Sequence, residues 1–477
     1  MASKDRLVPE LSFLPAMALV IGATIGSGIF VCTTDMAHSL PSGPWVIGVW
    51  IAAGLMTLLG ALSLSELATL IPETGGPYAF LRRAYGESWG FAFGWANLAV
   101  AGSGGIAGTA YLTASCVNAF VPLPHLGAEL ERWSIHIPYL GDIFPLAQFG
   151  LKSVSALIIA FLTGINVVGI RLGAWVQSIS TGLKLVLILG IIAVAYALGA
   201  QATFPPMAAA PAMPVGAALI TAIAAALSSA FWAYDGWANL SYVSGEIKNS
   251  ARIVPRAIVT GTLIVIVVYT LINIAYFRVL PVENILGSPE GNVGAAMVEA
   301  IVGKGGALFV TALILLSVFD CTNAGILTSA RVYYAMAADG CFPKRLSSIH
   351  PKFSSPHIAL WVQMFFSVVL VFTGSFELIA SMYVFVNWLF YLLLVCAVFV
   401  LRRRMGGTPS TGYRTPLYPW PPLLFALFST GFLIATLIGD IQSYVSGREP
   451  IIKSLAGLIL LLAGYPFYRM WKRANLR

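Results

Sequence analysis

The residues Gly22-Ala-Thr-Ile-Gly26-Ser-Gly28 interrupt an apolar segment that is otherwise long enough to cross a membrane as a helix. Three glycines within seven residues weaken a helix, because each costs about 1 kcal/mol of helix propensity relative to alanine. A second stretch, Phe231-Trp-Ala-Tyr-Asp-Gly-Trp-Ala-Asn239, places an acid, a glycine and an amide inside another apolar segment. Gly236 lies ten residues before Glu246, or about 15 Å along a helix, which puts this stretch near the centre of a bilayer.

The chain as a whole has the composition of an integral membrane protein. Of its 477 residues, 58% are hydrophobic and only 10% are charged, whereas about 25% are charged in an ordinary soluble domain. This excludes a water-soluble fold. Apolar runs of about 20 residues, the length that crosses a bilayer as a helix, recur along the chain. They predict an all-α membrane protein with twelve transmembrane helices, at about 11–38, 43–70, 88–119, 150–169, 173–199, 215–245, 256–281, 303–335, 357–374, 377–400, 418–440 and 451–471.

The basic residues favour one orientation of these helices. With both termini in the cytosol, twenty lysines and arginines fall on the cytosolic side and six on the other, and the twenty-seventh is Lys184. Cytosolic loops of membrane proteins carry such an excess of lysine and arginine. The formal charge of +8 therefore follows from topology and requires no nucleic acid partner.

The two irregular stretches lie in predicted helices 1 and 6, five helices apart. This spacing is typical of an inverted repeat, in which the first five helices and the next five are related by a pseudo-two-fold axis in the membrane plane. We therefore predict one integral membrane domain over residues 1–477, with repeats at about 11–199 and 215–400 and two extra helices at about 418–472.

Broken helices supply both kinds of partner that a zwitterion needs. Free N–H groups at a half-helix N-terminus attract an anion, and carbonyl groups released by the break accept hydrogen bonds from a cation or an ammonium group. An amino acid carries both charges and suits such a site. The alternative for the first stretch is close helix packing, because Gly22 and Gly26 form a small-xxx-small pair.

Lys184 is expected inside the membrane. The apolar run that follows it, 185–198, is only fourteen residues long, or about 21 Å, so predicted helix 5 must begin before it. A charged side chain at that depth costs about 2.5 to 3.5 kcal/mol on insertion scales. We interpret it as a fixed cation that bonds carbonyl groups freed in helix 1 and acceptors on helix 8. The alternative is a lysine that extends to the cytosolic interface.

Three polar side chains on predicted helix 8, Ser317, Asp320 and Asn323, are spaced three residues apart and share one face. A carboxylate there is not expected to face lipid. Asp320 belongs either to a structural ion pair or to a substrate contact, and we expect it to be satisfied by Lys184 or by its own polar stripe. Asp235 in helix 6 either caps N–H groups released by the break or contacts substrate.

Four ordered motifs resemble those of a known family, the L-amino acid transporter (light-chain) branch of the amino acid, polyamine and organocation superfamily. Together they span about residues 10–345, and beyond predicted helix 10 the similarity is mainly one of hydropathy. The motifs are 21–30 in helix 1, 71–78 followed by 82–86 and 94–95, 232–237 followed by 246–249 and 255–258, and 328–331 at the end of helix 8.

The resemblance implies a LeuT-like fold of five plus five inverted helices and sodium-independent exchange of neutral L-amino acids by alternating access, in a cell inner (plasma) membrane. It implies no enzymatic activity, metal or cofactor. Trp232 matches the aromatic that closes over the substrate, and Lys184 with Ser317 matches the fixed cation that replaces sodium. The substrate carboxylate site corresponds to Ile25, Gly26, Ser27 and Gly28, and the amine-binding carbonyl groups to Ile21, Trp232 and Tyr234.

Two features depart from the family pattern. Asp320 stands where many relatives have a small residue, which leaves substrate charge and proton coupling open. The predicted external loop 121–149 lacks the cysteine by which animal members are joined to a heavy chain. We therefore expect no disulfide-linked heavy chain, and we expect L-amino acids and the lipid bilayer as the partners.

Other functions stay open at this point. One is proton-coupled transport or exchange of cationic amino acids or polyamines, with Asp235, Asp320 and Asn323 as the coupling network, and a remote one is a membrane amino acid sensor. A membrane enzyme is disfavoured, because none of the five histidines lies at the centre of a predicted helix and neither an HExxH nor a GxSxG motif occurs.

Overall fold

The computed structural model describes residues 7–137, 141–202, 207, 209–288, 291–373, 376–405, 412–447 and 451–475. Helices make up nearly all the regular structure of these residues, which confirms the predicted all-α class. The exception lies in the predicted external loop. There the short helix α7 (Ala128–Glu131) precedes two antiparallel strands, β1 (Ile135–Ile137) and β2 (Gly141–Ile143).

Both predicted helix breaks are present. The first segment is divided into α1 (Phe13–Thr24) and α2 (Gly28–Ser39). The second is divided into α10 (Ala217–Tyr234) and a 3-10 helical segment, η3 (Asn239–Glu246). Gly236 between them has a φ of 111°, in the left-handed region that glycine adopts without strain. The irregular sequences therefore unwind the helices where they are expected to.

The other predicted transmembrane segments coincide with helices as well. Nine helical segments of the described chain are long and apolar enough to cross a membrane, so a multi-pass membrane protein is confirmed, while the count of twelve spans stays a prediction. The matching helices are α3 (Gly43–Leu70), α5 (Glu87–Ala96) continued by a π-helical turn η1 (Asn97–Ala101) and α6 (Gly102–Phe120), α8 (Phe149–Val167), α9 (Ile170–Leu198), α11 (Ser250–Val279), α14 (Lys304–Ala338), α15 (His357–Thr373), α16 (Phe376–Arg404) and α17 (Trp420–Val445).

The last predicted segment is not one continuous helix. α18 (Lys453–Leu462) ends in a turn, and α19 (Tyr465–Asn475) follows it. A Cβ atom at Gly464 would lie 2.5 Å from Cδ1 of Trp95, so the turn needs a glycine to pack against that indole. Further short helices connect the long ones: α4 (Pro77–Tyr85), α12 (Val282–Leu286) and α13 (Val293–Val302), with the 3-10 turns η2 (Gly199–Gln201) and η5 (Lys344–Ser347).

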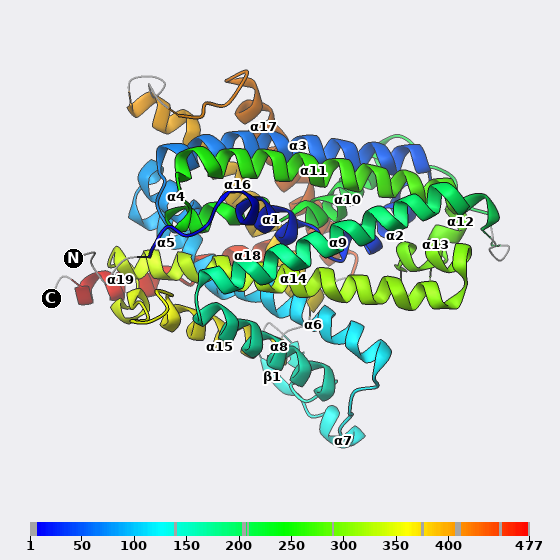
Figure 1. Cartoon of the computed structure of the whole chain (residues 1–477), viewed down its shortest axis with the longest axis horizontal. Helices are drawn as coiled ribbons and strands as arrows, with labels where there is room; N and C mark the ends of the chain where they lie inside the picture. Colours follow the sequence, from blue (N-terminus) through cyan, green and yellow to red (C-terminus); the bar gives the residue numbers. More distant parts are fainter. Residues whose placement is uncertain are drawn as a thin grey trace.

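Several of the long helices run along the longest axis of the molecule, most plainly α3, α9, α11 and α14 (Figure 1). The short helices α4 and α5 lie toward one end of this axis, together with α19. α2, α12 and α13 lie toward the other end. The topology predicted from the basic residues makes the first end cytosolic and the second external.

The two broken helices touch each other at their breaks. A Cβ atom at Gly236 would lie 2.6 Å from the carbonyl oxygen of Ala23, and a Cβ atom at Gly28 would lie 2.6 Å from the Cβ of Ala233. These distances are well inside van der Waals contact, so both positions require glycine. The unwound backbone at Gly236 is thereby held directly against the last turn of α1, and the first residue of α2 against the last turn of α10.

Candidate functional site

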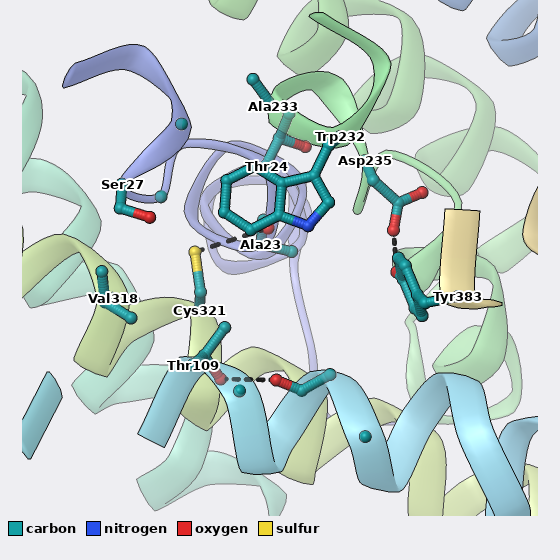
Figure 2. A pocket seen from close by; sticks show the side chains of 15 residues that line it. Ala23, Thr24, Ser27, Thr109, Trp232, Ala233, Asp235, Val318, Cys321 and Tyr383 are labelled. Atoms are coloured by element: carbon teal, nitrogen blue, oxygen red, sulfur yellow. Dashed lines mark hydrogen bonds between the residues drawn. The ribbon is translucent and has the colours of Figure 1, made fainter. Parts of the chain in front are cut away.

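A cavity of about 120 Å³ lies where the two breaks meet. Four of the residues predicted to bind substrate line it: Gly26, Ser27 and Gly28 from the first break, and Trp232 from the end of α10. Figure 2 shows the Trp232 ring and the Ser27 side chain around this space, with Cys321 and Thr109 opposite. The other lining residues are Ala23, Thr24, Gly104, Gly105, Gly108, Ala233, Asp235, Val318 and Tyr383.

The first turn of α2 directs backbone toward this cavity. Ser27, the residue before α2, makes no side-chain cap to the helix, and the first N–H groups of a helix have no partner within it. These groups carry the positive end of the helix dipole. The wall formed by Gly26, Ser27 and Gly28 can therefore accept a carboxylate without any basic side chain.

Of the three residues whose carbonyl groups were predicted to bind the substrate amine, only Trp232 lines the cavity. Ile21 O accepts a hydrogen bond from Ile25 N at 2.8 Å, and Trp232 O accepts one from Asp235 N at 3.4 Å. Ile21, Ile25 and Tyr234 are absent from the residues that line the cavity in the described chain. The Tyr234 hydroxyl instead donates to Trp50 O at 3.1 Å. The amine-binding role of these carbonyl groups stays a prediction.

Lys184 is fully buried at the middle of α9, and its ammonium group bonds the first break. Nζ donates to Gly22 O at 2.9 Å and to Ile25 O at 2.7 Å, and it lies 2.7 Å from Asp320 Oδ2. An ammonium group has three N–H donors, so these three oxygens use all of them. Of the two partners that the sequence allowed for Asp320, Lys184 or its own polar stripe, the structure shows Lys184.

The other two residues of the polar stripe on α14, Ser317 and Asn323, do not hydrogen-bond to Lys184. Ser317 Oγ is buried and has no hydrogen-bond partner among the described residues, so the acceptor that α14 offers to Lys184 is Asp320 and not the expected Ser317. Asn323 faces the packing of α8 and α9, where its amide donates to Gln177 Oε1 at 2.8 Å and accepts from Asn166 at 2.9 Å. Ser317, Asp320 and Asn323 lie about one helical turn apart along α14, so each side chain meets a different part of the neighbouring helices.

Asp235 lines the cavity and is held by α16. Its carboxylate accepts hydrogen bonds from the hydroxyl of Tyr383, from the hydroxyl of Tyr391 at 2.5 Å and from Asn387 Nδ2 at 3.5 Å; Figure 2 shows the contact with Tyr383. Sequence analysis missed these partners. Their spacing of four residues places them on one face of a helix, and this was the signal that could have found them.

Tyr269 on α11 ties the two breaks together and was also missed. Its buried hydroxyl lies 3.0 Å from Thr24 O and 2.9 Å from Ala233 O. A hydroxyl has a single proton to donate, so the two carbonyl groups share it. A lone tyrosine in an apolar run was the only sequence signal, and it did not indicate which backbone the hydroxyl would reach.

A larger cavity of about 720 Å³ adjoins the first one and shares Ser27 and Trp232 with it. Its wall also includes Asp35 of α2, Asp440 of α17 and Lys453 of α18. The indole of Trp232 therefore stands between the two spaces. In the predicted topology the larger cavity occupies the external half of the protein.

Buried ion pairs join helices at the opposite end. Arg331 Nε lies 2.8 Å from Glu246 Oε1, and both side chains are buried. Arg402 Nε lies 2.6 Å from Glu66 Oε1. Both arginines belong to the basic residues that the sequence assigns to the cytosolic side. Arg331 lies within the predicted helix 303–335, and α16 extends past its predicted end at residue 400 to include Arg402. These contacts connect η3 with α14, and α3 with α16.

Comparison with known proteins identifies relatives of the whole chain. Residues 11–462 match the family described as amino acid permease. The chain is 32% identical to the serine/threonine exchanger SteT of Bacillus subtilis over 98% of both chains. It is 28% identical to the human b(0,+)-type amino acid transporter 1, over 97% of this chain and 88% of that one. It is also 28% identical to the mouse large neutral amino acids transporter small subunit 2, over 97% and 81%.

Proposed function

The chain belongs to the amino acid permease family, and from this premise we propose that it is an amino acid antiporter, a sodium-independent exchanger of neutral L-amino acids that works by alternating access. One observation carries the proposal: the cavity between the two breaks offers α2 backbone at Gly26, Ser27 and Gly28, with Trp232 across from it. Similarity to a protein named as a serine and threonine exchanger supports exchange as the mode of transport.

In this proposal the substrate carboxylate binds the N–H groups of Gly26, Ser27 and Gly28, because the N–H of Ile25 already donates to Ile21 O. The substrate ammonium group binds carbonyl groups at the two breaks, those of Ile21, Trp232 and Tyr234. Free peptide groups at helix ends are suited to both charges. The contacts of Tyr269 with Thr24 O and Ala233 O keep the two breaks at a fixed separation, which an amino acid must span.

Lys184 takes the place of a coupling sodium ion. Its ammonium group already joins the carbonyl groups of Gly22 and Ile25 to the carboxylate of Asp320, as a bound cation would. A positive charge that is part of the chain needs no ion gradient to occupy its site. This supports sodium independence.

Trp232 is the proposed gate. A large planar side chain covers a substrate and excludes water with little loss of conformational freedom, and the indole stands between the small cavity and the larger one. With the buried ion pairs at the opposite end, this arrangement fits an outward-oriented state. We place the protein in the cell inner (plasma) membrane as two inverted repeats of five helices with two extra helices, and with both termini in the cytosol.

We further propose that the chain works without a disulfide-linked heavy chain. The mouse relative is named a small subunit, whereas the name of SteT, which matches over 98% of both chains, mentions no subunit. The sequence of the loop at 121–149 contains no cysteine. A covalent partner of that kind therefore has no attachment point there.

A second candidate is proton-coupled transport or exchange of cationic amino acids or polyamines. It is favoured by one observation, that the carboxylate of Asp235 lines the cavity. Against it, this carboxylate already accepts hydrogen bonds from Tyr383, Tyr391 and Asn387. Asp320 is paired with Lys184 and lies outside the cavity wall.

The test is uptake of labelled amino acids into liposomes that contain the purified protein. We expect uptake of neutral amino acids only when the liposomes are preloaded with amino acid, at the same rate in sodium and in choline buffers. Uptake into empty liposomes driven by a pH gradient, with arginine or polyamine as the preferred substrate, would establish the second candidate instead.

A further inference from the structure

A third cavity, polar and about 100 Å³ in volume, adjoins the substrate cavity on the side away from Trp232. The two cavities share six lining residues, which define the neck between them: Ala23, Gly105, Thr109, Asp235, Cys321 and Tyr383. We call this space of about 100 Å³ the inner cavity. Neither Trp232 nor Ser27 lines it, so it lies beyond the proposed binding groups for the substrate backbone.

The inner cavity is lined by neutral groups that form hydrogen bonds. They come from four elements around the space: Asn97 of η1, Asn239 and Tyr242 of η3, Ser329 of α14 and Asn387 of α16. The charged residue at its neck, Asp235, is already bonded by the two tyrosines of α16 and by Asn387. The chemistry of the wall therefore matches a neutral polar group better than a cation or an alkyl chain.

The side-chain amide of Asn97 can donate a hydrogen bond into the inner cavity. It lies in the π-helical turn between α5 and α6, an irregularity that is frequent at functional sites. The hydroxyl of Tyr333 donates to Asn97 Oδ1 at 2.8 Å. Because the carbonyl side of the amide is used in this way, its NH2 group is the side left to donate to a ligand in the cavity.

Gly105 sets the width of the neck. A Cβ atom added there would meet a single neighbouring atom within 4 Å in the described chain, Cε2 of Tyr383 at 3.8 Å, which is an ordinary van der Waals contact. The glycine is thus not required for packing. It leaves open space between the two cavities that any larger side chain would fill.

We propose that the inner cavity is a subsite for the substrate side chain and that Gly105 admits side chains long enough to reach it. The class of substrate it fits is a neutral amino acid whose side chain ends in a carboxamide, as in glutamine. A serine side chain ends within the substrate cavity. An alkyl side chain of the same length as glutamine leaves the asparagine and serine groups without partners, which selects against it. This inference rests on the proposed function, because it assumes that an amino acid binds at the breaks.

The experiment compares counterflow of labelled glutamine, serine and leucine in proteoliposomes for three proteins. We expect the wild type to exchange glutamine and serine, and to exchange leucine more slowly. Gly105→Val should reduce glutamine exchange about tenfold or more and serine exchange by a clearly smaller factor, because Gly105 also lines the substrate cavity. Gly190→Val is the matched control, because a Cβ atom at Gly190 of α9 meets no atom within 4 Å, and both rates should stay unchanged.

A second variant approaches the same space from another helix, in case Gly105→Val does not fold to a monodisperse protein. Ser329→Val adds bulk to the inner cavity from α14 and should also reduce glutamine exchange selectively. Wild-type protein that exchanges serine and excludes glutamine overturns this inference and leaves the proposed function intact. Equal loss of serine and glutamine exchange in both variants also overturns it. Monodisperse wild-type protein that exchanges no amino acid overturns the proposed function itself.

Discussion

The ammonium group of Lys184 lies 2.7 Å from the carboxylate of Asp320, although the two residues are 136 positions apart in the sequence. The same ammonium group donates to Gly22 O and Ile25 O. A buried ion pair is stable only when further hydrogen bonds satisfy it, and here those bonds come from unwound backbone. The shape of the first break and the charge state of the pair therefore depend on each other.

Lys184→Ala should abolish exchange while the protein still folds. Loss of the ammonium group leaves the carbonyl groups of Gly22 and Ile25 with only the weak thiol donor of Cys321, and this loosens the first break. We expect at least a tenfold fall in exchange rate, measured by counterflow, with a monodisperse profile in size-exclusion chromatography. Lys152→Met is the control, because Lys152 is also buried but bonds Phe144 O and Phe372 O elsewhere. Wild-type exchange by the Lys184 variant would remove the fixed-cation role, and recovery on adding sodium would support it.

Asp320→Asn should lower stability more than it alters selectivity. The substitution keeps an oxygen near Lys184 but leaves the buried ammonium group without a counter-charge, which costs about 3 kcal/mol. We expect a lower Tm in detergent, measurable exchange of neutral amino acids, and the wild-type order of preference among them. The double variant Lys184→Met/Asp320→Leu removes both charges and should recover part of the lost Tm. Selective loss of arginine, lysine or polyamine transport in Asp320→Asn would show that the carboxylate reads a cationic substrate.

Tyr269→Phe should weaken substrate binding without unfolding the protein. It removes only the hydroxyl that lies between Thr24 O and Ala233 O, so the two breaks lose their shared donor and their spacing relaxes. We expect a several-fold rise in KM for exchange and a small change in Tm. Tyr276→Phe provides the comparison, because that hydroxyl, two turns along α11, bonds a single carbonyl oxygen, Ile29 O, at 3.3 Å. Equal effects of the two variants would count against a special role for Tyr269.

Trp232→Ala should raise KM and slow exchange, because the substrate cavity then opens directly to the larger cavity and water enters it. The measurement is the concentration dependence of exchange in proteoliposomes. Trp361→Ala is the matched control, since Trp361 lies exposed on α15 and lines neither cavity. Unchanged kinetics in Trp232→Ala would assign this indole to packing.

The sequence by itself determined the class of the protein and the position of its irregularities. Composition and the length of apolar runs depend on the cost of placing polar groups in hydrocarbon, and that cost is local to each segment. Glycine lowers helix propensity wherever it occurs, so the breaks after Thr24 and after Tyr234 could be predicted residue by residue. Lys184 could be placed inside the membrane for the same reason, because the length of the following apolar run fixes its depth.

Only the tertiary structure decided which groups meet. Sequence reasoning offered both Ser317 and Asp320 as partners of Lys184 on helix 8, and the packing of α9 against α14 selects Asp320. It missed Tyr269, Tyr383 and Tyr391, because the sequence of one helix does not show which oxygen of another segment its hydroxyl will bond. The inner cavity could not be predicted either, since its wall combines residues from η1, η3, α14 and α16. Contacts between distant segments depend on how helices pack, and packing is a property of surfaces that no single segment contains.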